Sequence, residues 1–313
     1  MTRTIGVFIF PGIQILDATG PIAAFEIAAR FAPGAYSLRL LAMQAGPVAS
    51  SSGVSLTADA VGDEAFDTLL VAGGDGTREA YKDAATLAWL QGAAPRARRV
   101  ASVCSGAFLL AAAGLLDGRR ATTHWQRCGD FARVFPQVQV DPDRIFVRDG
   151  DVWTSAGISA GIDLALALIG EDLGEALARA VAQQLVVYHR RPGGQSQFSA
   201  LIEMGGHGGR VAPLLDWMRA RLAEPLGVER LADRAAMSPR HFARAFAAET
   251  GLTPAKAVER LRLEAARLRV ETTHEPIDRV AEAAGFGDPE RMRRAFLRAF
   301  GQPPQALRRA ARA

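Results

Sequence analysis

The chain has 313 residues, of which 49% are hydrophobic and 22% are charged, with 37 Lys and Arg against 33 Asp and Glu and only 2 Cys. This length favours two domains, and this composition indicates a globular protein. Two cysteines are too few for a disulfide framework, which suits the reducing cytoplasm. No apolar run reaches the roughly 20 residues of a membrane-spanning helix, so no membrane partner is expected.

Residues 4–190 alternate short apolar or β-branched runs with segments of helical period. The runs include "TIGVFIF", "YSLRLLAM", "DTLLVAGG" and "RRVASVC", and the helical segments include "PIAAFEIAARF" and "GAFLLAAAGLL". This alternation is typical of βαβ units and predicts a parallel sheet with helices on both faces. Residues 139–154 are expected to form a hairpin, and residues 161–188 to be helical.

The stretch "SVCSGAFLL" at 102–110 places Cys104 between a predicted strand and a predicted helix. Ser105 and Gly106 provide the compact backbone of a nucleophile elbow, in which the side chain projects over the edge of the sheet. The helix amino terminus there would favour a thiolate. Three roles stay open for Cys104: a nucleophile, a ligand contact, or a structural cysteine on a tight turn.

Two further side chains are expected near this elbow. Asp17 follows the first predicted strand, so it lies at the same carboxyl edge of the sheet, where ligands of open α/β sheets bind. His124 ends a later predicted strand and would complete a thiol, carboxyl and imidazole site. The amides of the glycine turn "VAGGDGT" are candidates for holding an anionic ligand group. No motif for a metal or a cofactor is found. The candidate ligand-binding residues are Asp17, Gly73, Gly74, Cys104, Ser105 and His124.

The composition changes after the first half of the chain. Residues 191–212 are rich in glycine and lack a sustained period, which predicts a loop and linker between domains at 1–190 and 213–313. Residues 213–313 hold 19 Lys and Arg against 13 Asp and Glu, whereas residues 1–212 hold 18 against 20. A basic module joined to a nearly neutral one indicates a polyanionic partner at one end of the chain.

The basic tail contains an internal repeat. "SPRHFARAFAAETGLTP" at 238–254 and "DPERMRRAFLRAFGQPP" at 288–304 place apolar, arginine, phenylalanine, glycine and proline residues at matching offsets. Each copy opens with a cap and a proline and follows a short predicted helix. A short helix, a tight turn and a capped second helix make a helix-turn-helix. The tail is therefore predicted to be all-α, with two such units joined by a long helix that begins at Pro254.

Each second helix has an apolar face and a polar face. The residues expected in the core are Phe242, Phe246, Met292 and Phe296. Arginine can pair bidentately with guanine in the major groove, while Ala243 reaches at most a thymine methyl and Arg298 is expected at a phosphate. The alternative is a solvated, arginine-rich surface. The candidates for contact with double-stranded DNA are Arg240, Ala243, Arg244, Glu290, Arg291, Arg293, Arg294 and Arg298.

The last hundred residues, and above all "VAEAAGFGDPERMRRAFLRAFGQPPQALR", resemble the AraC/XylS family of transcription regulators. This resemblance implies two recognition helices in successive major grooves on one face of the DNA. It also implies sequence-specific regulation, with activation as the expected sign and RNA polymerase as a further partner.

Residues 4–190 resemble the DJ-1/PfpI superfamily, related to class I glutamine amidotransferases, in "FPGIQILDATGP", "SVCSGAFLLAAAGLLDGRRATTHW" and "TSAGISAGIDLAL". The resemblance implies a flavodoxin-like parallel sheet sandwiched by helices. Ser105 stands where the peptidase branch has histidine, so a protease is not implied. Fused regulators of this type imply a homodimer and a small nitrogen-containing effector, such as an amino acid or a quaternary amine. The alternative is a cysteine-dependent hydrolase or isonitrile-hydratase-like enzyme with Cys104, Asp17 and His124 as catalytic residues.

Overall fold

The computed structural model describes residues 2–189, 194–195 and 212–310. The chain divides into two compact units, Met1–Arg191 and Pro192–Ala313. Most of the linker expected at 191–212 lies outside the described residues. Within the described ranges, no helix combines the length and the apolar character needed to cross a membrane.

The first unit is built on a mainly parallel sheet. Its strands are β1 Arg3–Phe8, β2 Tyr36–Ala42, β3 Gly46–Ala49, β4 Ser55–Ala60, β5 Thr68–Val71, β6 Arg99–Val103, β9 Phe146–Asp149 and β10 Val152–Ser155. The order is β3-β4-β2-β1-β5-β6-β10-β9, and the pairs from β4 through β10 are parallel. The edge strands β3 and β9 run antiparallel, and β9 with β10 forms the predicted hairpin. Two short strands, β7 Arg120–Ala121 and β8 Gln139–Val140, pair separately.

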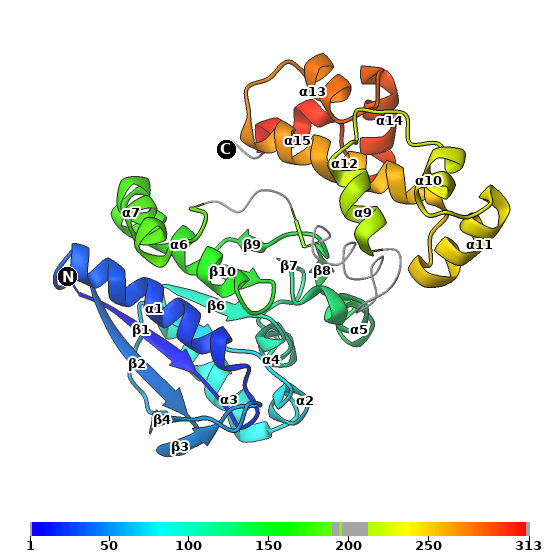
Figure 1. The fold of residues 1–313 in the computed structure, drawn as a ribbon. Helices are drawn as coiled ribbons and strands as arrows, with labels where there is room; N and C mark the ends of the chain where they lie inside the picture. The colour runs from blue at the N-terminus through cyan, green and yellow to red at the C-terminus, as the bar shows by residue number, and fades with distance from the viewer. Residues whose placement is uncertain (1, 190–193, 196–211, 311–313) are drawn as a thin grey trace. The chain divides into compact units, whose positions relative to one another are not determined.

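Helices cover both faces of this sheet, which confirms the predicted fold class (Figure 1). On one face, α1 Ile15–Phe31, α6 Ala160–Leu173 and α7 Glu175–Leu185 pack against one another. The other face carries α2 Thr77–Ala80, α3 Ala84–Ala93 and α4 Gly106–Ala112, and α5 Cys128–Val134 packs near β8. The helical stretch expected at 161–188 is two helices, because Gly174 interrupts it with a φ of 91°.

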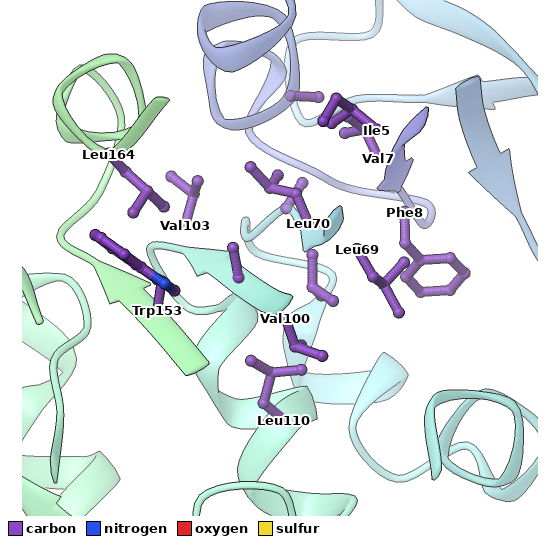
Figure 2. Packing of buried hydrophobic residues seen from close by; sticks show 14 of the residues in the cluster. Ile5, Val7, Phe8, Leu69, Leu70, Val100, Val103, Leu110, Trp153 and Leu164 are labelled. Carbon is purple, nitrogen blue, oxygen red and sulfur yellow. The ribbon is translucent and has the colours of Figure 1, made fainter. Parts of the chain in front are cut away.

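The main core lies between the sheet and these two helical layers. Figure 2 shows Leu164 of α6 beside Val103 of β6 on one side, and Leu110 of α4 near Val100 of the same strand on the other. Both leucines are fully buried. Burial of such a side chain stabilises a fold by about 1.5 to 3 kcal/mol, so the alternating strand residues hold both layers in place.

A buried ionic network lies at the edge of the sheet where the parallel strands begin. Arg99 opens β6, and its Nη2 lies 2.5 Å from Oδ2 of Asp172 on α6, with both side chains at most 2% exposed. The Nε of Arg99 donates to Oγ1 of Thr68 at 2.7 Å. Asp172 also accepts hydrogen bonds from Arg98 at 2.7 Å and from the hydroxyl of Tyr36 at 2.9 Å. These contacts supply the partners that a buried charge requires.

The second unit is helical, as predicted. Its helices are α9 Ala212–Arg219, α10 Val228–Arg234, α11 Pro239–Thr250, α12 Pro254–Thr272, α13 Ile277–Ala283, α14 Pro289–Phe300 and α15 Pro304–Ala310. The pairs α10–α11 and α13–α14 are the two helix-turn-helix units, and each has its own apolar core. The long helix α12 enters both cores, with Leu261 in the first and Val270 in the second.

The turn of the second helix-turn-helix unit is one residue longer than the turn of the first. The left-handed position of the first turn is Ala236, with a φ of 55°, whereas the second turn uses Gly285 at 80° and adds Gly287 at 71°. A β-carbon on Gly285 would lie 1.8 Å from the carbonyl oxygen of Leu222, and the Nε of Arg262 donates to the same oxygen at 3.0 Å. The second turn is therefore packed directly against the segment that precedes α10.

Candidate ligand site and nucleic-acid interface

Four neighbouring parallel strands bring the candidate ligand site together at their carboxyl ends. The chain leaves β1 for α1, which carries Asp17, and it leaves β5 at the turn of Gly73. Strand β6 leads directly into Cys104, and β10 leads into the turn that contains Ile158. All four positions meet at one edge, which is where ligands of such sheets bind.

The predicted elbow is present at Cys104. Its backbone φ of 58° lies in the left-handed region that residues with a β-carbon rarely adopt. Its amide donates to the carbonyl of Ser155 at 3.1 Å, and its carbonyl accepts from Oγ1 of Thr123 at 2.7 Å. Gly106 permits close packing, because a β-carbon there would lie 2.4 Å from the carbonyl oxygen of Val71. The surrounding backbone thus holds the cysteine in its strained conformation.

The carboxyl of Asp17 is fully buried and bridges two loops. Its Oδ1 accepts from the amide of Ile158 at 2.9 Å and its Oδ2 from the amide of Gly73 at 3.2 Å, and the thiol of Cys104 is also a hydrogen-bond partner. Burial raises the pKa of Asp17 to about 6, against the opposing effect of these hydrogen bonds. The carboxyl is therefore mostly ionised at neutral pH and takes up a proton in mildly acidic solution.

The thiol of Cys104 is protonated, contrary to the expectation from the helix amino terminus. Burial, followed by the nearby charge of Asp17, raises the pKa of Cys104 well above its usual range. The amide of Ser105 acts to lower this pKa, but the effect of burial is larger. The helix terminus therefore does not produce a thiolate here.

His124 and the thiol approach each other above Gly157. A β-carbon on Gly157 would lie 2.4 Å from Cδ2 of His124 and 2.8 Å from Sγ of Cys104. The Nδ1 of His124 accepts from the amide of Gln126 at 3.4 Å, which assigns the proton of the neutral ring to Nε2. Burial and then the charge of Arg127 lower the pKa of His124, so the ring is neutral at pH 7.

The amides of the glycine turn are bonded within the protein. Besides the bond from Gly73 to Asp17, the amide of Gly74 donates to Oγ of Ser105 at 2.9 Å, and that of Gly76 to the carbonyl of Gly12 at 3.1 Å. The amide hydrogens of Gly73, Gly74 and Gly76 are therefore already donated within the protein. Contact of Gly73 or Gly74 with a ligand stays a prediction.

Several residues of this edge were not predicted as site residues. Thr123 and Gly157 support the elbow and the imidazole, while Ile158, with a φ of 59°, supplies an amide to Asp17. Arg127 follows His124 in a short 3-10 turn, Trp125–Arg127, and its guanidinium lies 5.3 Å from the ring centroid of Phe108. Its Nε is buried and has no hydrogen-bond partner in the described part of the chain. The runs "TTHWQR" and "SAGIS" were the available sequence signals.

The second helices of the tail are capped as predicted. The Oγ of Ser238 accepts from the amide of His241 at 3.4 Å, and the Asp288 carboxylate accepts from the amides of Glu290 and Arg291 at 3.1 and 3.2 Å. All four predicted core residues are buried: Phe242, Phe246, Met292 and Phe296. Each helix therefore turns its apolar face inward and its polar face outward.

The predicted DNA-binding residues lie on the outward faces. Ala243 is half-buried, and the others are exposed: Arg240, Arg244, Glu290, Arg291, Arg293, Arg294 and Arg298. Arg293 is paired with Glu290 on the same helix, and Arg298 with Glu259 of α12. Among the described residues, no ion pair engages Arg240, Arg244 or Arg294.

Comparisons with known proteins identify both units. The DJ-1/PfpI family model matches residues 3–171, and a helix-turn-helix domain model matches residues 231–310. The chain is 30% identical over 307 residues to the HTH-type transcriptional regulator CdhR of Pseudomonas aeruginosa, covering 97% of this chain and 91% of that protein. The chain belongs to the DJ-1/PfpI-type transcription regulators. Both resemblances seen in the sequence, to DJ-1/PfpI proteins and to AraC-type regulators, are confirmed.

Two further proteins are similar to the regulator. An isonitrile hydratase of Pseudomonas putida is 38% identical over 189 residues, which cover 59% of the regulator and 78% of that enzyme. A THiJ/PfpI family protein from Pseudomonas syringae superposes with a TM-score of 0.55 and 25% identity, covering 83% of the regulator and 91% of that chain. The regulator is therefore similar in sequence both to a named enzyme and to named regulators.

Proposed function

We propose that the regulator binds DNA with α11 and α14 in two successive major grooves on one face of the duplex. The observation that carries this proposal is the duplicated unit: two capped helices, each with a buried apolar face and exposed arginines, joined by α12. This helix has 19 residues and is about 28 Å long at about 1.5 Å per residue. Successive groove faces lie about 34 Å apart, so one straight helix of this length is suited to set the spacing.

The exposed arginines divide by their surroundings. Arg240, Arg244 and Arg294 carry no ion pair among the described residues and are the proposed base readers. Arg298 pairs with Glu259 of α12. Burial and then the charge of Arg291 lower the pKa of Arg262, which lies on α12 as well. We assign Arg291 and Arg298 to phosphate contacts, which position a protein on DNA without reading its sequence. Ala243 is left with a thymine methyl at most.

The front unit is proposed to bind a small nitrogen-containing effector at the edge where Asp17, Cys104 and His124 meet. The ionised carboxyl of Asp17 suits an ammonium group, and the guanidinium of Arg127 beside His124 suits an acidic group, so an amino acid would match both. Effector binding would favour the DNA-competent arrangement, with activation of transcription as the sign. The proposal includes a homodimer formed through the front unit and contact with RNA polymerase.

A second candidate is turnover by Cys104. The elbow geometry and the isonitrile hydratase relative favour it, whereas the protonated thiol is a poor nucleophile. The test is incubation of the purified regulator with an alkyl isonitrile, in which water addition would give the N-alkyl formamide. Formamide that forms with the wild type but not with Cys104→Ala would establish the enzyme. If no formamide forms under conditions where effector binding is intact, the result supports a front unit that binds an effector without turnover.

DNA binding is tested with the full-length regulator and the duplex upstream of its own gene. Fluorescence anisotropy would compare this duplex with a scrambled duplex of the same composition at moderate salt. We expect a clear preference for the promoter duplex, reduced in both Arg244→Ala and Arg294→Ala. Equal affinity of the wild type for both duplexes would overturn the proposal.

Effector binding is tested by displacing His124 and Cys104 from their positions above Gly157. The β-carbon of Gly157→Ala would lie 2.4 Å from Cδ2 of His124 and 2.8 Å from Sγ of Cys104, so both side chains must shift although no polar group of the site is removed. Gly129→Ala is the matched control, because a β-carbon there meets nothing within 4 Å. A thermal-shift screen of amino acids and quaternary amines should give a stabilising compound for the wild type and the control, but not for Gly157→Ala. Unchanged stabilisation of Gly157→Ala would place the ligand elsewhere.

A further inference from the structure

Glu290 holds the guanidinium of Arg293 by two parallel hydrogen bonds on the outward face of α14. The Nε of Arg293 donates to Oε2 of Glu290 at 2.7 Å, and its Nη2 donates to Oε1 at 2.9 Å. This pairing uses one edge of the planar guanidinium. The Nη1 group and the second hydrogen of Nη2 remain on the other edge, and two donors in that arrangement match O6 and N7 of guanine.

We propose that Glu290 is a positioning residue that aims Arg293 at a guanine, and that it does not itself contact a base. The inference rests on the proposed function, in which α14 lies in a major groove. It assigns one base of the half-site under α14: a guanine read by Arg293.

The position of the pair on α14 supports this assignment. Glu290, Arg293 and Leu297 follow one another at spacings of three and four residues, so they form one stripe along the helix. The core residues Met292 and Phe296 lie on the opposite side. Leu297 is 38% exposed, an unusual apolar side chain on an outward face, and it suits a thymine methyl in the same groove.

The charges of the pair explain why the carboxylate is tolerated on a DNA-binding face. A free carboxylate would be repelled by the phosphates, whereas its charge is balanced here by Arg293. Both carboxylate oxygens accept from Arg293, so the carboxylate is held against that guanidinium. The pair also restricts the rotamers of a flexible arginine before DNA is met, which reduces the entropy lost on binding.

The helix-turn-helix unit of α10 and α11 has no ion pair that corresponds to Glu290 and Arg293. The residues of α11 that correspond to Glu290 and Arg293 are Arg240 and Ala243, since Pro239 corresponds to Pro289. An arginine and an alanine form no such pair. The two half-sites should therefore be read with unequal stringency, and the guanine fixed by Arg293 should have no counterpart under α11.

The test uses the full-length regulator and the duplex it selects from a randomised pool. Each base pair of this duplex is replaced in turn, and affinities are compared for the wild type, Glu290→Ala, Arg293→Ala and the double variant. The wild type should prefer guanine at one position by about tenfold or more, and Arg293→Ala should lose that preference. Glu290→Ala should lose most of it at the same position, with no additional loss in the double variant. Glu290→Ala should bind scrambled DNA more tightly, because a negative charge is removed.

A matched ion pair provides the control. Arg279 and Glu282 on α13 have the same spacing of three residues, with Nη1 and Oε2 3.1 Å apart, so Glu282→Ala should leave the guanine preference unchanged. Thermal unfolding of each variant reports whether α14 is intact, and Glu290→Gln should restore part of the preference by accepting one hydrogen bond. Additive losses in the double variant would mean that Glu290 reads a base itself and would overturn the inference. The inference would also be overturned if Glu290→Ala kept the full preference for guanine. If the wild type selects no duplex, the proposed function itself fails.

Discussion

Replacement of Asp17 by asparagine should change how the stability of the front unit depends on pH. The carboxyl is buried, and its pKa is raised from the ordinary 3.8 to about 6. A carboxyl with a raised pKa binds its proton more tightly in the folded state than in the unfolded state. Its contribution to stability is therefore complete below about pH 4 and is lost as the pH rises through about 6.

The size of this loss follows from the displacement of the pKa. A rise from 3.8 to about 6 corresponds to about 3 kcal/mol, since each tenfold change in proton affinity equals about 1.36 kcal/mol. The amide side chain of the Asp17→Asn variant would carry no charge at any pH. Its single acceptor, however, leaves one of the two backbone amides, from Gly73 or Ile158, without a good partner. That loss costs about 1 to 3 kcal/mol and does not depend on pH.

The assay is urea unfolding between pH 4 and pH 8, followed by tryptophan fluorescence, because three of the four tryptophans, Trp89, Trp125 and Trp153, lie in the front unit. Asp17→Asn should be the less stable protein at pH 4, and this disadvantage should shrink by about 2.5 kcal/mol by pH 8. Asp75→Asn, which removes an exposed carboxylate at the same edge, is the control. A stability difference between wild type and Asp17→Asn that stays constant with pH would refute the reasoning.

Three further predictions concern other parts of the chain. Asp172→Ala leaves Arg99 buried without its main partner and should lower the free energy of unfolding by about 3 to 5 kcal/mol in urea titrations, while a loss below about 1 kcal/mol would argue against the network. Gly285→Ala combines a left-handed φ of 80° with a β-carbon 1.8 Å from a carbonyl oxygen, so calorimetry should show a loss beyond the about 1 to 2 kcal/mol of backbone strain. Arg294→Ala should weaken binding to the promoter duplex by about 1 to 3 kcal/mol, and an equal loss on scrambled DNA would contradict base reading.

Much of the fold follows from local patterns in the sequence. The continuous apolar run of β6 and the small residues after it predicted both a buried central strand and the elbow at Cys104. The capped repeats predicted α11 and α14 because caps, prolines and apolar spacing agree at the same residues. The β3–β4 hairpin was not predicted, since the edge strand β3 has only four residues and "SLTADA" of β4 is mostly exposed and carries no strong apolar alternation.

The site was predicted less completely, for physical reasons. A backbone donor such as the amide of Ile158 has no signature in the sequence, because any residue except proline provides one. The protonation of Cys104 was misjudged since the helix terminus is visible in the sequence, whereas the depth of burial is not. The pairing of Glu290 with Arg293 did have a signal, a spacing of three residues on a helix, which was interpreted only as two separate contacts to DNA.

A hydroxyl-radical and methylation-interference footprint of the full-length regulator tests the central claim most directly. Two contacted major-groove patches should appear on one face of the duplex, about 10 base pairs apart. Arg244→Ala should weaken one patch and Arg294→Ala the other. A single patch, or two patches that both variants weaken alike, would contradict the assignment of α11 and α14 to separate grooves.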